Sequence, residues 1–181
     1  MAYCNPITLA GVNNACSTSI GGVSDVYITP YKDDLFTASE LENVDAIDSI
    51  TALTTGNTWY HYIFAKGTTS LTNAATIDAA NGIKFVDTTL SMVFSKQDAE
   101  KRLEVSALLL GQVAVIVKDM NGKYQYLGSQ TPVEATEAGG QLGQARTDGN
   151  NYTITLTDTT SVYPPFLSDE AIEDLKELVQ G

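Results

Sequence analysis

The sequence is short of the residues from which enzymes build most metal centres and nucleophilic sites. It contains one histidine, His61, and two cysteines, Cys4 and Cys16. Structural zinc sites need four clustered Cys or His ligands, and these three residues cannot supply them. A glycine-rich phosphate loop ending in Lys-Ser or Lys-Thr is also missing. We therefore assign no catalytic, cofactor-binding or metal-binding residue, and we expect a protein that is not an enzyme.

The lone histidine and the two cysteines admit more than one interpretation. His61 lies between Tyr60 and Tyr62, so a packed or hydrogen-bonded position in a β-strand is favoured. A Ser-His-Asp or Cys-His site built on this histidine stays open as an alternative. Cys4 and Cys16 are either two reduced thiols or one small-loop disulfide. The reduced state is favoured, because a core of this size folds without a disulfide.

Basic residues are scarce as well. The chain carries 22 acidic residues against 10 basic ones, which gives a formal net charge of −12. Proteins that grip nucleic acid through its phosphates need clustered Lys and Arg, so the charge argues against that class. One stretch gathers six carboxylates, and we interpret it as a solvated face rather than a catalytic pair or a weak calcium site: Asp33, Asp34, Glu40, Glu42, Asp45 and Asp48.

Long apolar runs are absent. No window approaches the roughly 20 apolar residues of a membrane helix. The opening residues MAYCNPITLA lack the basic start and continuous apolar stretch of a secretory signal. We therefore expect a protein made in the cytoplasm with no membrane partner. A length of 181 residues, of which 43% are hydrophobic, suits one domain with one sizeable core.

What the sequence does hold is a series of patterns typical of β-structure. Residues 59–65 are dense in aromatic and β-branched side chains, which predicts a strand covered on both faces. Asp119-Met120-Asn121-Gly122 predicts a tight turn within a hairpin. Alternation of apolar and polar residues predicts further strands at residues 23–29, 83–94, 113–117, 124–127 and 152–157.

Two helices are expected after strands. Ser95 is the expected N-cap of a helix over about residues 96–110, and Gly111 is its expected C-cap. The predicted apolar stripe of this helix is Ala99, Leu103, Ala107 and Leu110. Ser168 is the expected cap of a last helix, whose apolar stripe is Ile172, Leu175 and Val179.

The remaining segments are less regular. Leu41, Val44 and Ile47 recur at three-residue spacing, which predicts a short helix with an acidic outer face within residues 32–48. Residues 67–82, rich in Thr, Asn and Ala, are expected to form a long loop with a partner to touch. Residues 129–150, rich in glycine, are expected to form a flexible surface loop.

Together these segments predict a mainly β fold, a β-sandwich or barrel with one flanking helix and a short C-terminal helix. Residues 1–22 are polar and without a period, and we interpret them as an N-terminal arm. The β-domain then covers residues 23–166, and Pro164-Pro165 breaks the chain near its end. Residues 167–181 hold the C-terminal helix.

Three segments of the chain resemble a known family. The run NGIKFVDTTLSMVFSKQDAEKRLEVSALLLGQVAVIVKDMNGKYQYLG, residues 81–128, resembles the central part of the tail tube (major tail) proteins of long-tailed bacteriophages. The order of a long strand, a charged helix and a hairpin carries this resemblance. The segments CSTSIGGVSDVYI, residues 16–28, and DGNNYTITLT, residues 148–157, are also similar to that family.

The resemblance implies a structural virion protein, made in the cytoplasm of a bacterial host and located in the tail. Six copies would close into a ring, and stacked rings would form a tube through which DNA passes without specific binding. The hairpin strands would line the lumen as one intersubunit sheet. The N-terminal arm, residues 67–82 and the C-terminal helix would contact neighbouring subunits, rings or other tail and head–tail proteins. A lumen lined with carboxylates repels DNA phosphates, which fits the acidic composition.

Two alternatives stay open. A ring or adaptor protein of a phage head–tail junction would share the fold and the acidic lumen. A non-viral β-domain that binds carbohydrate or protein should carry an aromatic platform in exposed loops, whereas Trp59 lies within a predicted strand.

Overall fold

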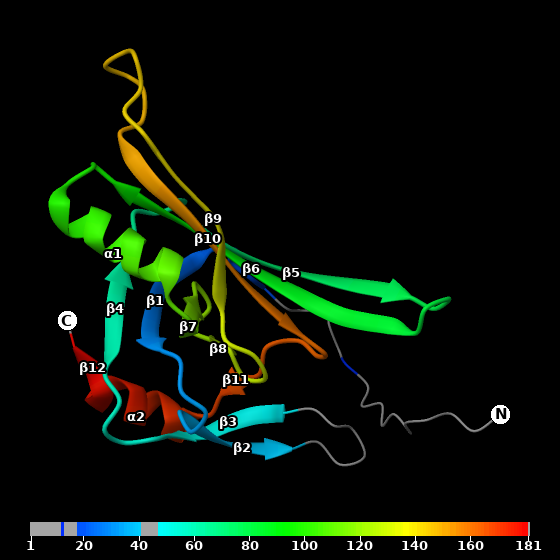
Figure 1. The fold of residues 1–181 in the computed structure, drawn as a ribbon. Helices are drawn as coiled ribbons and strands as arrows, with labels where there is room; N and C mark the ends of the chain where they lie inside the picture. The colour runs from blue at the N-terminus through cyan, green and yellow to red at the C-terminus, as the bar shows by residue number, and fades with distance from the viewer. Residues whose placement is uncertain (1–11, 13–17, 41–46, 181) are drawn as a thin grey trace.

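The computed structural model describes residue 12 and residues 18–40 and 47–180. Within these residues the chain is mainly β, with one helix flanking a sheet and a short helix near the C-terminus, as predicted (Figure 1). The expectations for Cys4, Cys16, Glu42, Asp45 and most of the N-terminal arm fall outside the described residues.

The larger sheet has eight strands in the order β12-β4-β1-β7-β8-β11-β3-β2. The central strand β1 (Val23–Pro30) pairs antiparallel with β4 (Trp59–Ile63) and with β7 (Val113–Asp119). The predicted tight turn joins β7 to β8 (Tyr124–Leu127). The outer strands are β2 (Phe36–Glu40), β3 (Ile47–Leu53), β11 (Phe166–Leu167) and β12 (Val179–Gln180).

The smaller sheet has four strands in the order β5-β6-β10-β9, and every neighbouring pair is antiparallel. Its strands are β5 (Thr69–Asp78), β6 (Ile83–Ser95), β9 (Glu134–Gln141) and β10 (Asn151–Thr160). Strand β10 pairs with β6 only as far as Val86, whereas β5 pairs with β6 as far as Ile83. The tip of the β5–β6 hairpin therefore projects beyond the rest of the sheet (Figure 1).

One hydrophobic core lies between the two sheets. Alternate residues of β6 and β10 are buried, because a strand turns successive side chains to opposite faces. These side chains pack against the inward residues of β1 and β7 in one cluster, which includes Leu90, Met92, Ile154, Leu156, Val26, Ile28, Val115 and Val117. A second cluster fills the other face of the larger sheet, beneath α2 (Asp169–Leu178), and includes Trp59, Ile116, Tyr126, Ala171 and Leu175.

The flanking helix α1 (Ala99–Leu110) begins three residues later than predicted. Asp98, not Ser95, is its N-cap, and the Asp98 carboxylate accepts a hydrogen bond of 3.0 Å from the backbone N–H of Lys101. Ser95 is still paired with Asn151 in the sheet, so it cannot start a helix. At the other end, the N–H of Gly111 donates to the carbonyl of Ala107, and Gly111 is the C-cap as predicted.

The predicted apolar stripe of α1 was wrong. Val105 and Leu108 face the core, whereas Leu103 is 65% exposed and Leu110 is 88% exposed. Apolar residues occur on more than one side of this helix, so the period alone does not select the buried side. By contrast, Ser168 caps α2 as predicted, and Leu175 of its predicted stripe is buried.

The helix expected within residues 32–48 is also wrong in the described part. Phe36–Glu40 and Ile47–Leu53 are two strands that pair antiparallel as β2 and β3. Phe36, Ala38 and Ile47 pack against the second core cluster. The inward positions of Phe36 and Ala38 alternate with outward ones, as in a strand, and the three-residue spacing did not indicate the structure of this segment. The four described carboxylates of the acidic stretch are exposed, as expected for a solvated face: Asp33, Asp34, Glu40 and Asp48.

Two predicted loops contain strands. Residues 67–82 contain the whole of β5 and the turn after it, and residues 129–150 contain β9. Both strands lie at the edges of the smaller sheet and are mostly exposed, so they lack the buried alternating residues that identify a strand in sequence. Backbone pairing with β6 and β10 holds them in place.

One expectation about exposure was wrong as well. In β4 only Trp59 is buried, because the strand lies beside the two-residue strand β12 near one end of the sheet. In β7, residues Val113 to Val117 are buried on both faces, between the two core clusters. The β7–β8 hairpin, which the family resemblance assigned to a lumen, therefore has little surface to offer.

Candidate assembly surface

A polar cluster surrounds His61 on the face of the larger sheet that α2 partly covers. The Nε2 atom of His61 lies 2.9 Å from Oδ1 of Asp25, and Nζ of Lys118 lies 3.4 Å from Oδ2 of the same carboxylate. The ring of Tyr27 stacks on His61 with centroids 4.6 Å apart. The predicted hydrogen-bonded sheet position of His61 is confirmed.

The cluster does not have the geometry of a nucleophilic triad. The hydroxyl of Ser24 donates to Asp25 at 2.8 Å and not to His61. Burial raises the pKa of Asp25, but the hydrogen bonds from His61 and Ser24 and the charge of Lys118 outweigh it, so the pKa lies below its usual value. An ionised Asp25 that holds three strands together is a structural group.

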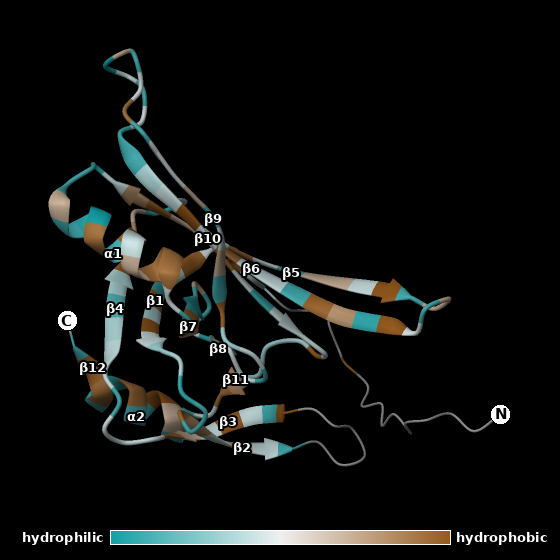
Figure 2. Ribbon diagram, in the orientation of Figure 1, coloured by the Kyte–Doolittle hydropathy of each residue, from teal (hydrophilic) through white to brown (hydrophobic). Residues whose placement is uncertain are grey.

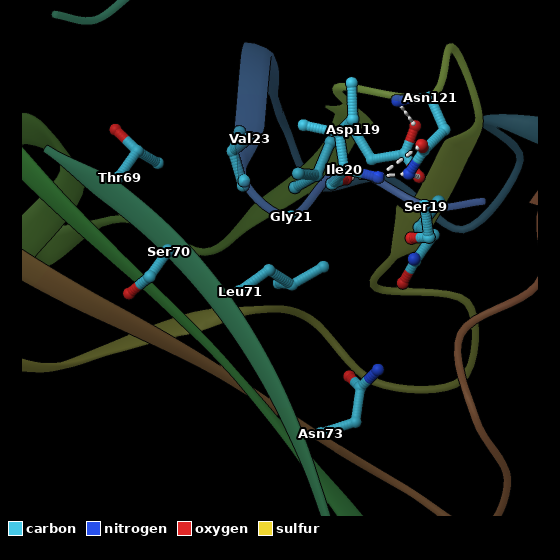
Figure 3. Close-up of a pocket in the computed structure, with 13 residues that line it drawn as sticks. Ser19, Ile20, Gly21, Val23, Thr69, Ser70, Leu71, Asn73, Asp119 and Asn121 are labelled. Carbon is cyan, nitrogen blue, oxygen red and sulfur yellow. Dashed lines mark hydrogen bonds between the residues drawn. The ribbon is translucent and has the colours of Figure 1, made fainter. Parts of the chain in front are cut away.

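A pocket of about 320 Å³ lies where the chain enters β1 (Figure 3). The side-chain amide of Asn121 clamps the segment before β1, because it accepts from the N–H of Ile20 and donates to the Ile20 carbonyl, both at 2.9 Å. The only carboxylate among the pocket-lining residues, Asp119, already accepts hydrogen bonds from the backbone of Asn121 and Lys123 in its own turn. Asn121 thus fixes the start of β1, and the Asp119 carboxylate is already used by the hydrogen bonds of its own turn.

Asp158, at the end of β10, is the one buried charged side chain among the described residues, with 1% of its surface exposed. Its carboxylate accepts hydrogen bonds from the N–H of Gly128 at 2.9 Å and from the Thr131 hydroxyl at 3.4 Å. Burial raises the pKa of Asp158, and these two bonds only partly offset the effect. Asp158 therefore ties the smaller sheet to the turn after β8, from which the chain runs into β9.

The outward face of the smaller sheet is built mainly from hydroxyl side chains. On β10 these are Thr153, Thr155, Thr157 and Thr159, which alternate with the buried Ile154 and Leu156. Hydrogen bonds link them across strands: the hydroxyls of Thr136 and Thr157 lie 3.1 Å apart, and the Thr159 hydroxyl donates to Asp87 at 2.6 Å. This face is mainly polar, and the register also places Phe85, Val93 and Ile83 on it.

Charge on this face has one sign. The register places four carboxylates on it, from Asp78, Asp87, Glu134 and Glu137. The Glu134 carboxylate, at the start of β9, also accepts a hydrogen bond of 2.7 Å from the side chain of Gln112, next to the end of α1. The described strand positions of this face include no Lys or Arg, since Lys84 has the parity of the buried Val86 and points to the other side. A sheet face whose charged groups are all carboxylates repels a polyanion.

Both edges of the smaller sheet are open within the described residues. On β5 the residues from Thr69 to Ile77 carry no charge and no proline, and their pairing with β6 has no bulge. Monomeric proteins usually protect an edge strand with charge, proline or a bulge. Strand β9, at the other edge, carries Glu134 and Glu137 and has one register shift. The sequence signal for these edges is weak, because their neutral and small residues are equally typical of a loop.

The described residues contain no group of three or more His, Cys, Asp or Glu side chains placed to hold a metal ion. None of their helices is both long and apolar enough to cross a membrane.

Comparison of the chain with protein-family models, with curated proteins and with solved structures gives no match in any of the three.

Proposed function

We propose that this protein is a structural subunit of a bacteriophage tail tube, in which copies join edge to edge into a closed ring and rings stack into a tube for DNA. In this proposal the protein is not an enzyme, and its place is the tail of the virion after synthesis in the bacterial cytoplasm. The observation that carries the proposal is the smaller sheet, which combines two open edges with one acidic, hydroxyl-rich face.

The strand directions of the smaller sheet suit head-to-tail joining. Its four strands alternate in direction, so β5 of a second copy can add antiparallel to β9 and continue the same alternation. The contact is heterologous, because it joins two different edges, and repeated heterologous contacts close into a ring when the rotation permits. Closure leaves no free edge, which removes the aggregation risk of the unprotected strand β5.

The proposed lumen wall is the outward face of the smaller sheet. This changes the expectation for the β7–β8 hairpin, whose strands lie in the interior of the subunit. In a ring the carboxylates of Asp78, Asp87, Glu134 and Glu137 repeat around the channel. DNA phosphates are repelled from such a wall, so DNA slides along it without specific binding.

The size of the assembled protein tests the proposal. Purified protein is measured by light scattering over a range of concentration and salt, and the same samples are viewed by negative-stain electron microscopy. Stacked rings or tubes with a central channel are expected. Single rings that do not stack would favour the head–tail adaptor, and a monomer at high concentration, in salt and in crowding agents, would overturn self-assembly.

A further inference from the structure

The flank of α1 that lies beside β9 exposes apolar side chains with no partner among the described residues. Leu109 is 48% exposed and Leu110 is 88% exposed. Together with Glu134 and Ala135 of β9 they line a hollow at the edge of the smaller sheet. Because Leu108 packs into the core between the sheets, α1 lies on the inner side of this edge. Leu110 is about 200° further around the helix and points away from that core.

The opposite edge exposes apolar side chains on the same inner side. Leu71 of β5 packs against the core, and alternation puts Asn73, Ala75 and Ile77 on the face of Leu71. Ile77 is 69% exposed, near the projecting tip of the hairpin. Figure 2 shows apolar residues both at this end of β5 and along α1.

We infer that α1 clamps the contact between copies, with Leu109 and Leu110 of one copy packing on Ala75 and Ile77 of β5 from a second copy. This inference rests on the proposed function, because it takes the β5-to-β9 contact as its starting point. A strand added to the free edge of β9 keeps its inner face on the side of α1. The exposed leucines then lie over the inner face of that strand.

The size of a strand contact shows why side-chain cover is needed. Eight paired residues make a strip about 27 Å long and about 4.8 Å wide. That strip covers roughly 130 Å² in projection, far less than the roughly 800 Å² per partner of a stable interface. The α1 flank is the apolar surface that adjoins β9 and so extends the contact.

Charge favours a second copy that meets β9 through β5 over one that meets it through β9. Joining β9 to β9 would bring Glu134 and Glu137 of both copies together, which is unfavourable for like charges on neighbouring strands. The residues of β5 from Thr69 to Ile77 are uncharged, so they meet the acidic edge without repulsion.

Cross-linking tests the geometry. In a Cys4→Ser, Cys16→Ser background, one preparation carries Leu110→Cys and a second carries Ile77→Cys, and the two are mixed and mildly oxidised. A disulfide-linked dimer that contains one chain of each kind is expected, identified by mass. Ile77→Cys linked to itself would favour a β5-to-β5 contact and would overturn the inference.

A pair of matched variants tests the energetics. Leu109→Ser with Leu110→Ser is expected to weaken assembly about tenfold or more, by light scattering, while the unfolding curve shows that the monomer stays folded. Ile63→Ser, on β4 and 76% exposed, is the control and is expected to assemble normally. If wild-type protein assembles but the leucine variant assembles equally well and no mixed cross-link forms, the inference fails and the proposed function stands. If wild-type protein does not assemble at all, both fail.

Discussion

The Nε2 atom of His61 on β4 lies 2.9 Å from Oδ1 of Asp25 on β1, and Lys118 on β7 approaches the other oxygen of the same carboxylate. One ionised side chain therefore connects three neighbouring strands of the larger sheet, β4, β1 and β7. Ser24 adds a third contact from within β1. His61, the only histidine, thus contributes to stability through its contact with Asp25, a residue that the sequence analysis did not identify.

Asp25→Asn is expected to lower the free energy of unfolding by about 1 kcal/mol at pH 7. The pKa of Asp25 is lower in the folded protein than the usual value, so its contribution is fully present above the unfolded pKa of about 3.9. It is lost as the pH falls through the folded pKa. Urea unfolding at neutral and acidic pH measures this effect.

The matched control for that variant is Asp33→Asn, which changes an exposed carboxylate of the acidic stretch. Its free energy of unfolding should stay within about 0.5 kcal/mol of wild type. A difference between Asp25→Asn and wild type that persists undiminished in acid would contradict a role for the charge of Asp25.

Asp158 should respond differently to the same kind of change. Asp158→Ala leaves the N–H of Gly128 without its buried acceptor and is expected to cost about 2 kcal/mol of stability. Asp158→Asn keeps an acceptor for Gly128, and its new N–H group stands opposite Thr88, whose hydroxyl has no partner among the described residues. Asparagine should therefore be tolerated within about 0.5 kcal/mol or stabilise the protein at pH 7.

The pH dependence of Asp158→Asn has a defined sign. Because the folded pKa of Asp158 is raised, the cost of burying its charge is absent below the unfolded pKa of about 3.9 and complete above the folded pKa. The stability of the asparagine variant relative to wild type should thus increase with pH across that window. Urea unfolding at pH 7 and below pH 4 tests it, and asparagine as damaging as alanine at pH 7 would show that the charge itself is needed.

Charge at the β5 edge should control assembly. Thr72 lies on the outward face of β5, opposite Thr89 of β6, and is exposed. Thr72→Glu would place a carboxylate toward Glu134 and Glu137 of the next copy and is expected to weaken assembly at low salt, with recovery at high salt. Thr72→Lys, of similar size, is the control and should assemble at least as well as wild type. Equal light scattering from both variants would exclude the β5-to-β9 contact.

The acidic outward face should keep DNA from binding. Glu134→Lys with Glu137→Lys is expected to produce salt-dependent binding of duplex DNA, measured by gel mobility, where wild type shows none. Asp33→Lys with Asp34→Lys makes the same change in net charge on the acidic stretch. DNA binding by this control as strong as that of the first variant would show that the position of the carboxylates does not matter.

Part of the fold follows from residues close together in sequence. The alternation around Ile154 and Leu156 predicted β10, and Asn121-Gly122 predicted the turn of the β7–β8 hairpin. Ser168 predicted the start of α2, because a cap bonds to a backbone group only three residues away. These features depend on local geometry, and local geometry is determined by residues that are close neighbours in the sequence.

The candidate surface could not be predicted in the same way. Strands β5 and β9 have few buried residues, so their place in the sheet comes from backbone pairing with β6 and β10. The buried side of α1 was wrong because the helix has apolar residues on several sides, and only the position of the sheet selects Val105 and Leu108. For the same reason Leu109 and Leu110 could not be recognised as exposed.

The sequence by itself determined a mainly β chain with an excess of carboxylates, few groups for catalysis and a helix after its longest strand. Only the tertiary structure decided which carboxylates share a face, because Asp78, Asp87, Glu134 and Glu137 come from three strands brought together by pairing. It also decided which strands are left as edges, since an edge is defined by the absence of a neighbour and not by the residues of the strand itself.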